Sequence, residues 1–308
     1  MRVVFMGTPD FAVGTLEAIC DAGYEVAGVV TQPDKAKGRS KELVPTPVKA
    51  AALARGLNVF QPVKIRDAQA IEAVRQMKPD VIVVVAFGQI IPQEILDMAP
   101  YGCLNVHASL LPAYRGAAPI QWAVLNGDEE SGVTIMRMDA GLDTGDMIAK
   151  KVVKLAADET SGSLFDRLSA EGAKFLVETL PSVFDGTAVY EKQPEESTTP
   201  YAGMIQKKMG EINWNDSAEK IERLVRGMNP WPSAYTKLDG KTLKIWKAHV
   251  EKPEMTGDVG KIVRMDKKGM YVQTGQGILC VDELQIEGKK RMNTGDFLRG
   301  YVVRNNQL

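Results

Sequence analysis

The sequence predicts an α/β fold: a Rossmann-like, mostly parallel sheet with helices on both faces, followed by a small C-terminal β-barrel domain that is OB-like. The first half alternates strand-like apolar runs with segments whose apolar residues recur at helical spacing, which is typical of βαβ units. Within it, the run from Asp80 to Ala86 is uninterrupted and β-branched, as in a central parallel strand buried on both faces. The last third holds short strand-like runs separated by glycines and charged residues, which indicates a small barrel.

The elements of the first half follow from these patterns in chain order. Strands are expected at Arg2–Met6, Glu25–Val30, near Val59, Asp80–Ala86, Cys103–Ala108, Val133–Met138 and Met147–Val153. Helices are expected at Phe11–Ala22, Ala50–Arg55 and Ala68–Gln76, with a polar loop over residues 33–49. The first strand, helix and second strand fall within about 30 residues, which is the length of a βαβ opening.

The second half changes character at a polar segment without periodicity, Asp185 to Tyr201, which predicts a linker. Beyond it, Ser217 is a candidate N-cap for one amphipathic helix. The run Asn229-Pro-Trp-Pro232 cannot continue that helix, because proline removes a backbone donor. Five short strand-like runs follow. We expect a catalytic domain at residues 1–189, a linker at 190–206 and a β-barrel domain at 207–308.

Length and composition limit the class of protein. At 308 residues the chain suits two domains. Its longest apolar run, Val81 to Phe87, is far shorter than a membrane span, and the first residues lack the pattern of a secretory signal. Three scattered cysteines without CxxC spacing indicate a reducing compartment and argue against disulfides or a structural zinc site. We therefore expect a cytoplasmic monomer without membrane contact.

Charge is unevenly distributed along the chain. The net charge is −1, yet from Tyr201 onward there are 19 Lys+Arg against 13 Asp+Glu, so the preceding part is acidic. Such an asymmetry favours a C-terminal part that meets a polyanion, although a random surface imbalance would look the same.

The glycine turn after the first strand argues against a dinucleotide site. Such a site requires G-x-G-x-x-G there and an acidic residue at the end of the second strand. This chain has Gly7-Thr-Pro-Asp-Phe-Ala12, and its second strand ends in Thr31-Gln32. A nicotinamide dehydrogenase is therefore not expected.

Two polar side chains share one face of the strand that begins at Cys103. Residues two apart in a strand point the same way, so Asn105 and His107 lie side by side. Burying an amide and an imidazole without partners costs several kcal/mol. The pair suits the carboxyl end of a parallel strand, where such folds bind ligands. A hydrogen-bonded core histidine beside a strand-end cap is the alternative.

A second polar cluster, Asp139-Ala-Gly-Leu-Asp143-Thr-Gly-Asp146, lies between two strand-like runs. Asx turns would explain Asp139 and Asp146 without a function, and the twelve-residue EF-hand pattern of a calcium loop is absent. One carboxylate aimed at His107 would complete a set that can stabilise an oxyanion and move protons during acyl transfer.

Together these residues resemble a known family. The runs Asn105-x-His107-x-Ser-Leu-Leu-Pro112, Tyr114-Arg-Gly-Ala-Ala-Pro-Ile120 and Asp143-Thr-Gly-Asp146 are similar to the core of the folate-dependent formyltransferases. The resemblance implies 10-formyltetrahydrofolate as co-substrate, no metal, and Asn105, His107 and Asp143 as catalytic residues. It also implies that Val85 to Ile91 and Met138 to Asp143 bind the pterin largely through backbone groups. The substrate-binding residues expected from it are Ser109, Leu110, Leu111, Pro112, Phe87, Gly88, Gln89 and Ile90.

Other segments resemble the members of this family that act on methionyl-tRNA. These are residues 7–12, the basic loop 37–49 and residues 229–232, with departures from the usual pattern at Ser40, Glu42 and Ser233. The resemblance implies formyl transfer to the α-amino group of initiator methionyl-tRNA for translation initiation. Candidate tRNA contacts are Arg39, Lys41, Lys207 and Lys208.

Two other functions stay open. A formyltransferase acting on a small amine, such as an aminosugar nucleotide, would share the core motifs, but the basic loop and the basic C-terminal part count against it. A non-catalytic RNA-binding protein on a degenerate core would be expected to lack one of the three catalytic residues. For the enzyme we expect direct transfer without an acyl-enzyme, because no general base stands beside Ser109 or a cysteine in the motif.

Overall fold

The computed structural model describes residues 1–37, 42–251 and 257–308 of the chain. The chain divides into two compact units. Unit 1 comprises residues 1–119, 130–154 and 165–202, and unit 2 comprises residues 120–129, 155–164 and 203–308. Among the described residues, no helix combines the length and the apolar character that crossing a membrane requires.

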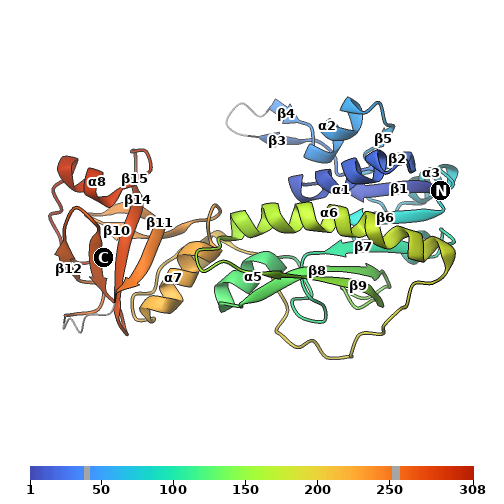
Figure 1. Ribbon diagram of the computed structural model, residues 1–308. Helices are drawn as coiled ribbons and strands as arrows, with labels where there is room; N and C mark the ends of the chain where they lie inside the picture. The colour runs from blue at the N-terminus through green and yellow to red at the C-terminus, as the bar shows by residue number, and fades with distance from the viewer. Residues whose placement is uncertain (38–41, 252–256) are drawn as a thin grey trace. The chain divides into compact units, whose positions relative to one another are not determined.

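Unit 1 is built on a seven-stranded sheet with the order β5-β2-β1-β6-β7-β8-β9 (Figure 1). Its strands are β1 (Arg2–Gly7), β2 (Glu25–Val30), β5 (Val59–Phe60), β6 (Val81–Val85), β7 (Cys103–His107), β8 (Glu130–Arg137) and β9 (Met147–Lys154). The first five strands along this order pair in parallel, whereas β7–β8 and β8–β9 pair antiparallel. The sheet is therefore mixed but mostly parallel, which confirms the predicted fold class.

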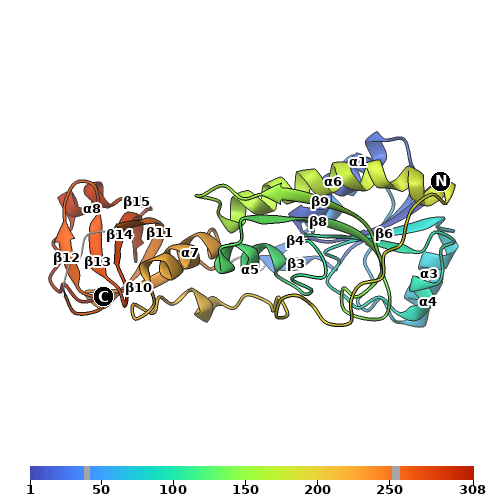
Figure 2. The ribbon, with the colours of Figure 1, turned by 60° about the horizontal axis from the view of Figure 1, so that its bottom comes forward.

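Helices cover both faces of this sheet (Figure 2). On one face, α3 (Ala68–Gln76) and α4 (Gln93–Leu96) pack on alternate residues of β1 and β6, including Val4 and Ile82. The opposite face carries α1 (Asp10–Asp21) and α6 (Ser161–Asp185), which meet where the rings of Phe11 and Phe165 lie 5.3 Å apart. Successive side chains of a strand point to opposite faces of the sheet, so neighbouring residues of β1 and β6 pack on different sides.

Residues 33–49, expected as a loop, contain additional regular structure. Strands β3 (Lys35–Lys37) and β4 (Glu42–Val44) pair antiparallel, and α2 (Pro47–Ala54) follows. The helix begins three residues before the predicted Ala50, because the Thr46 hydroxyl accepts from the Lys49 amide and Pro47 suits the first helical turn.

Unit 2 contains an antiparallel sheet with the order β10-β11-β14-β13-β12, and β15 pairs with β14. Its strands are β10 (Ala234–Leu238), β11 (Lys241–Glu251), β12 (Ile262–Met265), β13 (Met270–Gln273), β14 (Ile278–Ile286) and β15 (Met292–Asn293). The other elements are α5 (Pro119–Asn126), the 3-10 helix η1 (Lys207–Gly210), α7 (Ala218–Gly227) and α8 (Thr294–Gly300). The predicted N-cap is confirmed, since the Ser217 hydroxyl accepts from the Lys220 amide at 3.2 Å.

Candidate active site

Strand β7 holds Asn105 and His107 on one face of the unit 1 sheet. Val106 points to the face covered by α6, since a side chain at Gly172 of that helix would meet it. The alternation of β7 therefore directs Asn105 and His107 to the opposite face. Both are buried, Asn105 to 9% and His107 to 6% exposure. The strand order reverses between β1 and β6. In sheets of this kind a ligand crevice lies beyond the carboxyl ends of the strands at such a reversal.

The two nitrogens of His107 face different groups. Nε2 lies 3.0 Å from the backbone carbonyl oxygen of Tyr114, and because a carbonyl can only accept, Nε2 donates. Nδ1 lies 3.7 Å from Oδ1 of Asp143, which is an ion-pair distance and too long for a direct hydrogen bond. The backbone therefore fixes the orientation of the ring, and Nδ1 is left facing the carboxylate.

Asp143 is held in the loop between β8 and β9. Its Oδ2 accepts from the Gly116 amide at 2.9 Å, and its backbone adopts a φ of 55°, a left-handed conformation that is uncommon outside glycine. Asp139 plays a different part, because its Oδ1 accepts from the Gly141 amide and the Thr144 hydroxyl. The Asx-turn interpretation therefore holds for Asp139, and Asp143 is the carboxylate that faces His107.

The side-chain amide of Asn105 makes no intramolecular hydrogen bond with any described residue. Its nitrogen and oxygen are not among the fully enclosed polar atoms without a partner, so the amide keeps access to solvent and is open to a ligand. Asn105 pairs with Val84 of β6 and Met136 of β8, which fixes it between two neighbouring strands.

The segment after β7 supports the site through its backbone. The Ser109 hydroxyl is buried and donates to the Ala113 carbonyl at 2.6 Å. Thr134, opposite His107 on β8, donates to the Ser109 carbonyl and accepts from the Leu111 amide. Leu111 packs in an apolar cluster with Met136 and Met147, and its peptide bond to Pro112 is cis. Leu110 and Pro112 are half-buried.

The loop after β6 lies at the same edge of the sheet. Phe87 is buried, and its carbonyl accepts from the Thr8 hydroxyl at 2.9 Å and from the Gln32 amide. Gly88 has a φ of 84° and is exposed, while Gln89 is tied to the Ile65 amide at 2.7 Å. Ile90 is 87% exposed, as single apolar side chains on a protein surface often are.

Comparison with known proteins decides the family. Residues 1–180 match the Formyl transferase family, and residues 204–302 match the Formyl transferase, C-terminal domain family. The methionyl-tRNA formyltransferases of Agathobacter rectalis and Lachnospira eligens are 63% and 57% identical to this chain. The two alignments span 98% and 97% of this chain and 97% and 96% of those proteins.

The chain belongs to the methionyl-tRNA formyltransferases. It is therefore an enzyme that formylates methionyl-tRNA for translation initiation, in a folate-dependent family, as the sequence predicted.

Solved structures share the fold at low identity. HypX from Aquifex aeolicus in complex with tetrahydrofolic acid superposes with a TM-score of 0.62 at 19% identity, covering 97% of this chain and 48% of HypX. The sugar 3N-formyl transferase WlaRD gives a TM-score of 0.68 at 18% identity, covering 94% and 99%. The methionyl-tRNA formyltransferase from Clostridium thermocellum gives 0.55 at 19% identity, covering 82% and 94%.

The cysteines of this methionyl-tRNA formyltransferase are free and unsuited to nucleophilic catalysis. All three are unpaired. Burial raises the pKa of the Cys103 thiol and of the Cys280 thiol to about 12, and it also raises the pKa of Cys20. Because the thiolate is the nucleophilic form, these thiols stay unreactive near neutral pH.

The basic residues suggested for tRNA binding differ in their surroundings. Lys207 and Lys208 are exposed on η1 of unit 2. Arg39 and Lys41 lie outside the described residues. Arg226 forms an ion pair with Glu222 at 2.6 Å and donates to the Glu159 carbonyl, so its guanidinium serves the structure of unit 2.

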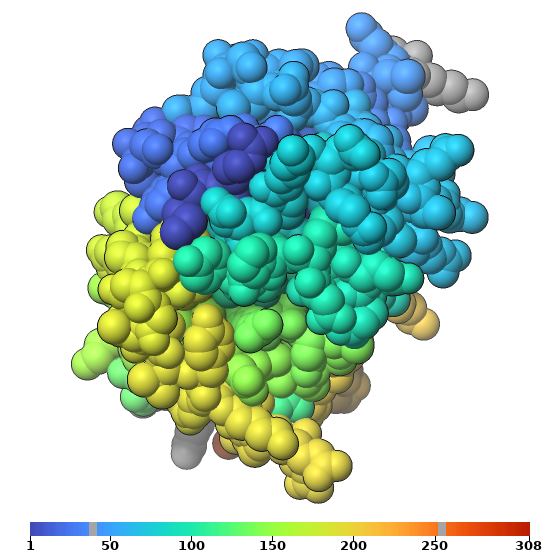
Figure 3. Space-filling model, turned by 90° about the vertical axis from the view of Figure 1, so that its right-hand side faces the viewer, coloured from blue at the N-terminus to red at the C-terminus, as the bar shows by residue number. Residues whose placement is uncertain are grey.

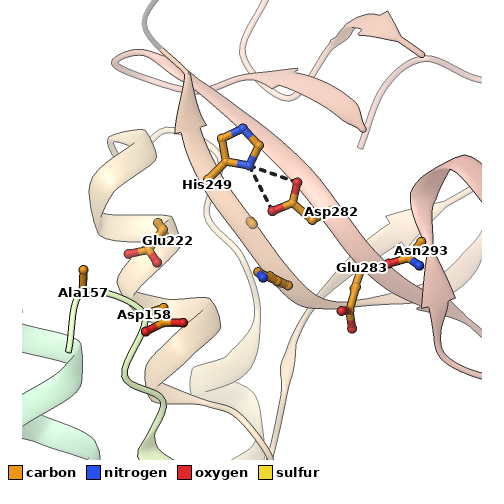
Figure 4. A pocket seen from close by; sticks show the side chains of 9 residues that line it. Ala157, Asp158, Glu222, His249, Asp282, Glu283 and Asn293 are labelled. Carbon is orange, nitrogen blue, oxygen red and sulfur yellow. Dashed lines mark hydrogen bonds and ion pairs between the residues drawn. The ribbon is translucent and has the colours of Figure 1, made fainter. Parts of the chain in front are cut away.

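Unit 2 also contains a cavity of about 520 Å³ lined by residues of α7, β11 and β14 (Figure 4). Nδ1 of His249 lies 2.9 Å from Asp282, and Nε2 of the same ring lies 3.7 Å from Glu251. The sulfur of Cys280 is near this pair, but its raised pKa keeps it a thiol at neutral pH. The arrangement fits a hydrogen-bonded pair of His249 and Asp282 at the surface beside a buried thiol.

Two residues that the sequence did not single out contact the site loops. The Arg115 guanidinium and the Gln193 side-chain amide are both buried, and Gln193 hydrogen-bonds to the backbone of Asp143. Arg115 was visible within the Tyr114–Ile120 motif. Gln193 lies in the polar segment that was expected only as a linker, where no periodicity or motif distinguishes it.

Proposed function

We propose that Asn105, His107 and Asp143 are the catalytic residues that transfer the formyl group of 10-formyltetrahydrofolate to the α-amino group of initiator methionyl-tRNA. The observation that carries the proposal is the Asn105 amide, which is open to a ligand and has no intramolecular partner among the described residues, beside a His107 ring that faces Asp143. Asn105 and His107 share a strand face near the carboxyl end of β7, where mostly parallel sheets bind ligands, and Asp143 of the β8–β9 loop faces His107.

The three residues have complementary roles in direct transfer. The methionyl amine, with an unperturbed pKa near 8, is partly neutral at physiological pH and can attack the formyl carbon. The Asn105 amide donates a hydrogen bond to the resulting oxyanion. Nε2 of His107 already donates to the Tyr114 carbonyl, so a hydrogen bond from this ring to the oxyanion comes from Nδ1. Each such donor contributes roughly 3 kcal/mol to transition-state stabilisation. The Asp143 carboxylate accepts the proton of the amine through water. Collapse of the oxyanion then breaks the bond between the formyl carbon and the folate nitrogen, and that nitrogen takes a proton back through the same water and leaves as tetrahydrofolate.

The donor and tRNA assignments extend this proposal. The pterin is expected against Phe87, Gly88, Gln89 and Ile90 and against residues 109–112. The position of residues 87–90 just beyond β6, at the carboxyl end of a parallel strand, supports this edge. For the tRNA, we infer contacts from Arg39, Lys41, Lys207 and Lys208. We assign catalysis to residues 1–189 and tRNA binding to residues 207–308, joined by residues 190–206.

We also propose that the enzyme is a cytoplasmic monomer. The three unpaired cysteines agree with a reducing compartment. Sedimentation equilibrium of the full chain should give a mass near 33.6 kDa, and a dimer mass would contradict the proposal.

A transfer assay with labelled 10-formyltetrahydrofolate and charged initiator tRNA tests the catalytic assignment. Asn105→Ala, His107→Ala and Asp143→Asn should each lower kcat by about 10²–10³ with donor binding nearly intact. Asp97→Asn, an exposed position at the end of α4, serves as the control and should retain full activity. Wild-type turnover by any of the three variants would remove that residue from the catalytic set. An aminosugar nucleotide offered as acceptor should remain unformylated.

A further inference from the structure

Residues 190–202, here called the strap, pack along unit 1. Glu191 and Met147 exchange two backbone hydrogen bonds of 2.8 Å, which attach the start of the strap to β9. Figure 3 shows the chain after α6, in yellow, on the surface beside the green residues of β8 and β9. Farther along, the Ser197 hydroxyl donates to the Pro112 carbonyl at 2.6 Å, and the Ala202 amide donates to the Arg115 carbonyl. The strap therefore contacts both loops that flank His107.

Gln193 joins these two loops through one side chain. Its Nε2 donates to the carbonyl oxygens of Asp143 at 2.9 Å and of Gly145 at 2.7 Å. Its Oε1 accepts from Nε of Arg115 at 3.0 Å. Gln193 is 5% exposed, so both amide protons and the amide oxygen are satisfied inside the protein. The side chain fixes the backbone at Asp143 to the loop that carries Tyr114.

Arg115 attaches the same loop to the strap. Its Nη1 donates to the Glu195 carbonyl at 3.0 Å, and its Nη2 donates to the Pro194 carbonyl at 2.7 Å. The planar guanidinium thus binds three strap acceptors at once, which a lysine ammonium cannot match in geometry. A side chain at Gly116 would meet Tyr201 and the Ala202 carbonyl, so the strap lies against this loop without space between them.

The residues held in this way have strained backbones. Tyr114 and Asp143 have φ values of 57° and 55°, in the left-handed region. Non-glycine residues persist there only where the surroundings hold them, at a cost of about 1–3 kcal/mol each. The strap supplies a contact at each: the Tyr114 amide donates to Thr199 Oγ1 at 2.7 Å, and the Asp143 carbonyl accepts from Gln193. The same two residues contact or face His107.

We propose that Gln193, held by Arg115, is a positioning residue that fixes the Asp143 carboxylate opposite His107. The inference rests on the proposed catalytic role of Asp143. Gln193 touches neither substrate nor the reacting atoms in this account. It acts by holding the 143–145 backbone, and a displacement of about 1 Å at a catalytic group can lower the rate 10²-fold.

Gln193→Glu separates positioning from packing. The substituted carboxylate keeps the shape of the side chain and the acceptor for Arg115, but when ionised it cannot donate to the Asp143 and Gly145 carbonyls. The matched control is Glu196→Gln, the reverse change at an exposed position of the strap. We expect Gln193→Glu to lower kcat roughly 10-fold to 100-fold with an unchanged KM for 10-formyltetrahydrofolate, and the control to match wild type.

A second readout does not depend on turnover. The Gly116 amide donates to Asp143 Oδ2, so its hydrogen exchange, resolved by NMR, reports whether the carboxylate stays in place. In Gln193→Glu this amide should exchange faster than in wild type, while amides of the central strand β6 keep their protection. If Gln193→Glu is too unstable to assay, Arg115→Lys is measured in the same way, with a smaller loss of kcat in the same direction.

Asp143→Asn, assayed in parallel, distinguishes the two levels of the proposal. Full activity of Asp143→Asn would mean that the catalytic assignment is wrong. An inactive Asp143→Asn beside a Gln193→Glu with wild-type kcat and unchanged Gly116 exchange would overturn the positioning role alone. An effect of Gln193→Glu on the KM for the donor at constant kcat would also overturn it.

Discussion

Asn105 and His107 are neighbouring polar groups on one strand, and both are proposed to act on the same oxyanion. Their side chains lie on the same face of β7 and both are buried. His107 has its orientation set by the Tyr114 carbonyl, whereas Asn105 has no intramolecular partner among the described residues. The histidine is therefore pre-oriented by the protein, whereas no described residue orients the Asn105 amide.

We expect the effects of Asn105→Ala and His107→Ala to be less than additive. Both groups are assigned to one oxyanion, and residues that act as a unit lose most of their effect with the first substitution. The loss of kcat in the double variant, measured under saturating donor and methionyl-tRNA, should therefore be much smaller than the product of the two fold-losses in the single variants. Strict additivity of the two activation free energies would contradict a shared oxyanion.

For single residues, the sequence predicts those features of the site that depend on local periodicity. The shared face of Asn105 and His107 follows from the two-residue repeat of a strand. Asp143 could not be chosen over Asp139 by spacing, because both lie in the same turn and only the folded loop shows which carboxylate faces His107. Gln193 carries no local signal at all, since its role comes from contacts with residues about 50 and 80 positions earlier in the chain.

Helices and strands also differ in how well the sequence predicts them, because some depend on local patterns and others on long-range contacts. The helix Ala68–Gln76 and the strand Glu25–Val30 have the bounds that their patterns predict. The β3–β4 hairpin was missed because each strand has three residues, too short for a periodicity to be recognised. The antiparallel pairing of β8 and β9 also lies beyond local patterns, since a strand has the same sequence character in either direction.

Asp34, just before β3, is joined to Lys49 of α2 and to Gln61. This carboxylate accepts from Lys49 Nζ at 2.6 Å and from Gln61 Nε2 at 2.7 Å. The hydrogen bonds from Lys49 and then Gln61 lower the pKa of Asp34. A lowered pKa in the folded state means that these contacts stabilise the protein at neutral pH, and that the stabilisation is lost as the pH falls through the lowered pKa.

We therefore expect Asp34→Asn to loosen the hairpin at neutral pH. Backbone amides of Glu42–Val44 should exchange faster in the variant by hydrogen-exchange mass spectrometry. As the pH is lowered below the Asp34 pKa, the wild type should approach the variant after correction for intrinsic exchange rates. Asp21→Asn, which removes an exposed ion pair with Arg55, is the matched control. Equal exchange in Asp34→Asn and wild type at neutral pH would show that the ion pair does not restrain the hairpin.

At the scale of the whole molecule, charge is unevenly distributed along the chain. The part that begins at Tyr201 is basic and the preceding part is acidic, although the net charge of the chain is −1. Since Arg226 is committed to Glu222, and Arg291 to Glu283, not every basic residue of this part is available to a phosphate. Lys207 and Lys208, exposed on η1, remain candidates. The sequence predicts the asymmetry, but only the structure shows which cations already have partners.

Binding of methionyl-tRNA should weaken steeply with salt, because each phosphate contact releases condensed counterions. In equilibrium titrations, the double variant Lys207→Gln with Lys208→Gln should lower the slope of log Kd against log salt concentration by roughly 1 for each phosphate contact removed. The matched control is Lys150→Gln with Lys151→Gln, an exposed lysine pair on β9 of unit 1, which should leave the slope unchanged. Both double variants remove the same charge. A difference between them therefore reports a specific phosphate contact and not the net charge of the protein. Equal slopes in both double variants would assign tRNA affinity to net charge alone, and a salt-independent Kd in the wild type would contradict phosphate contacts altogether.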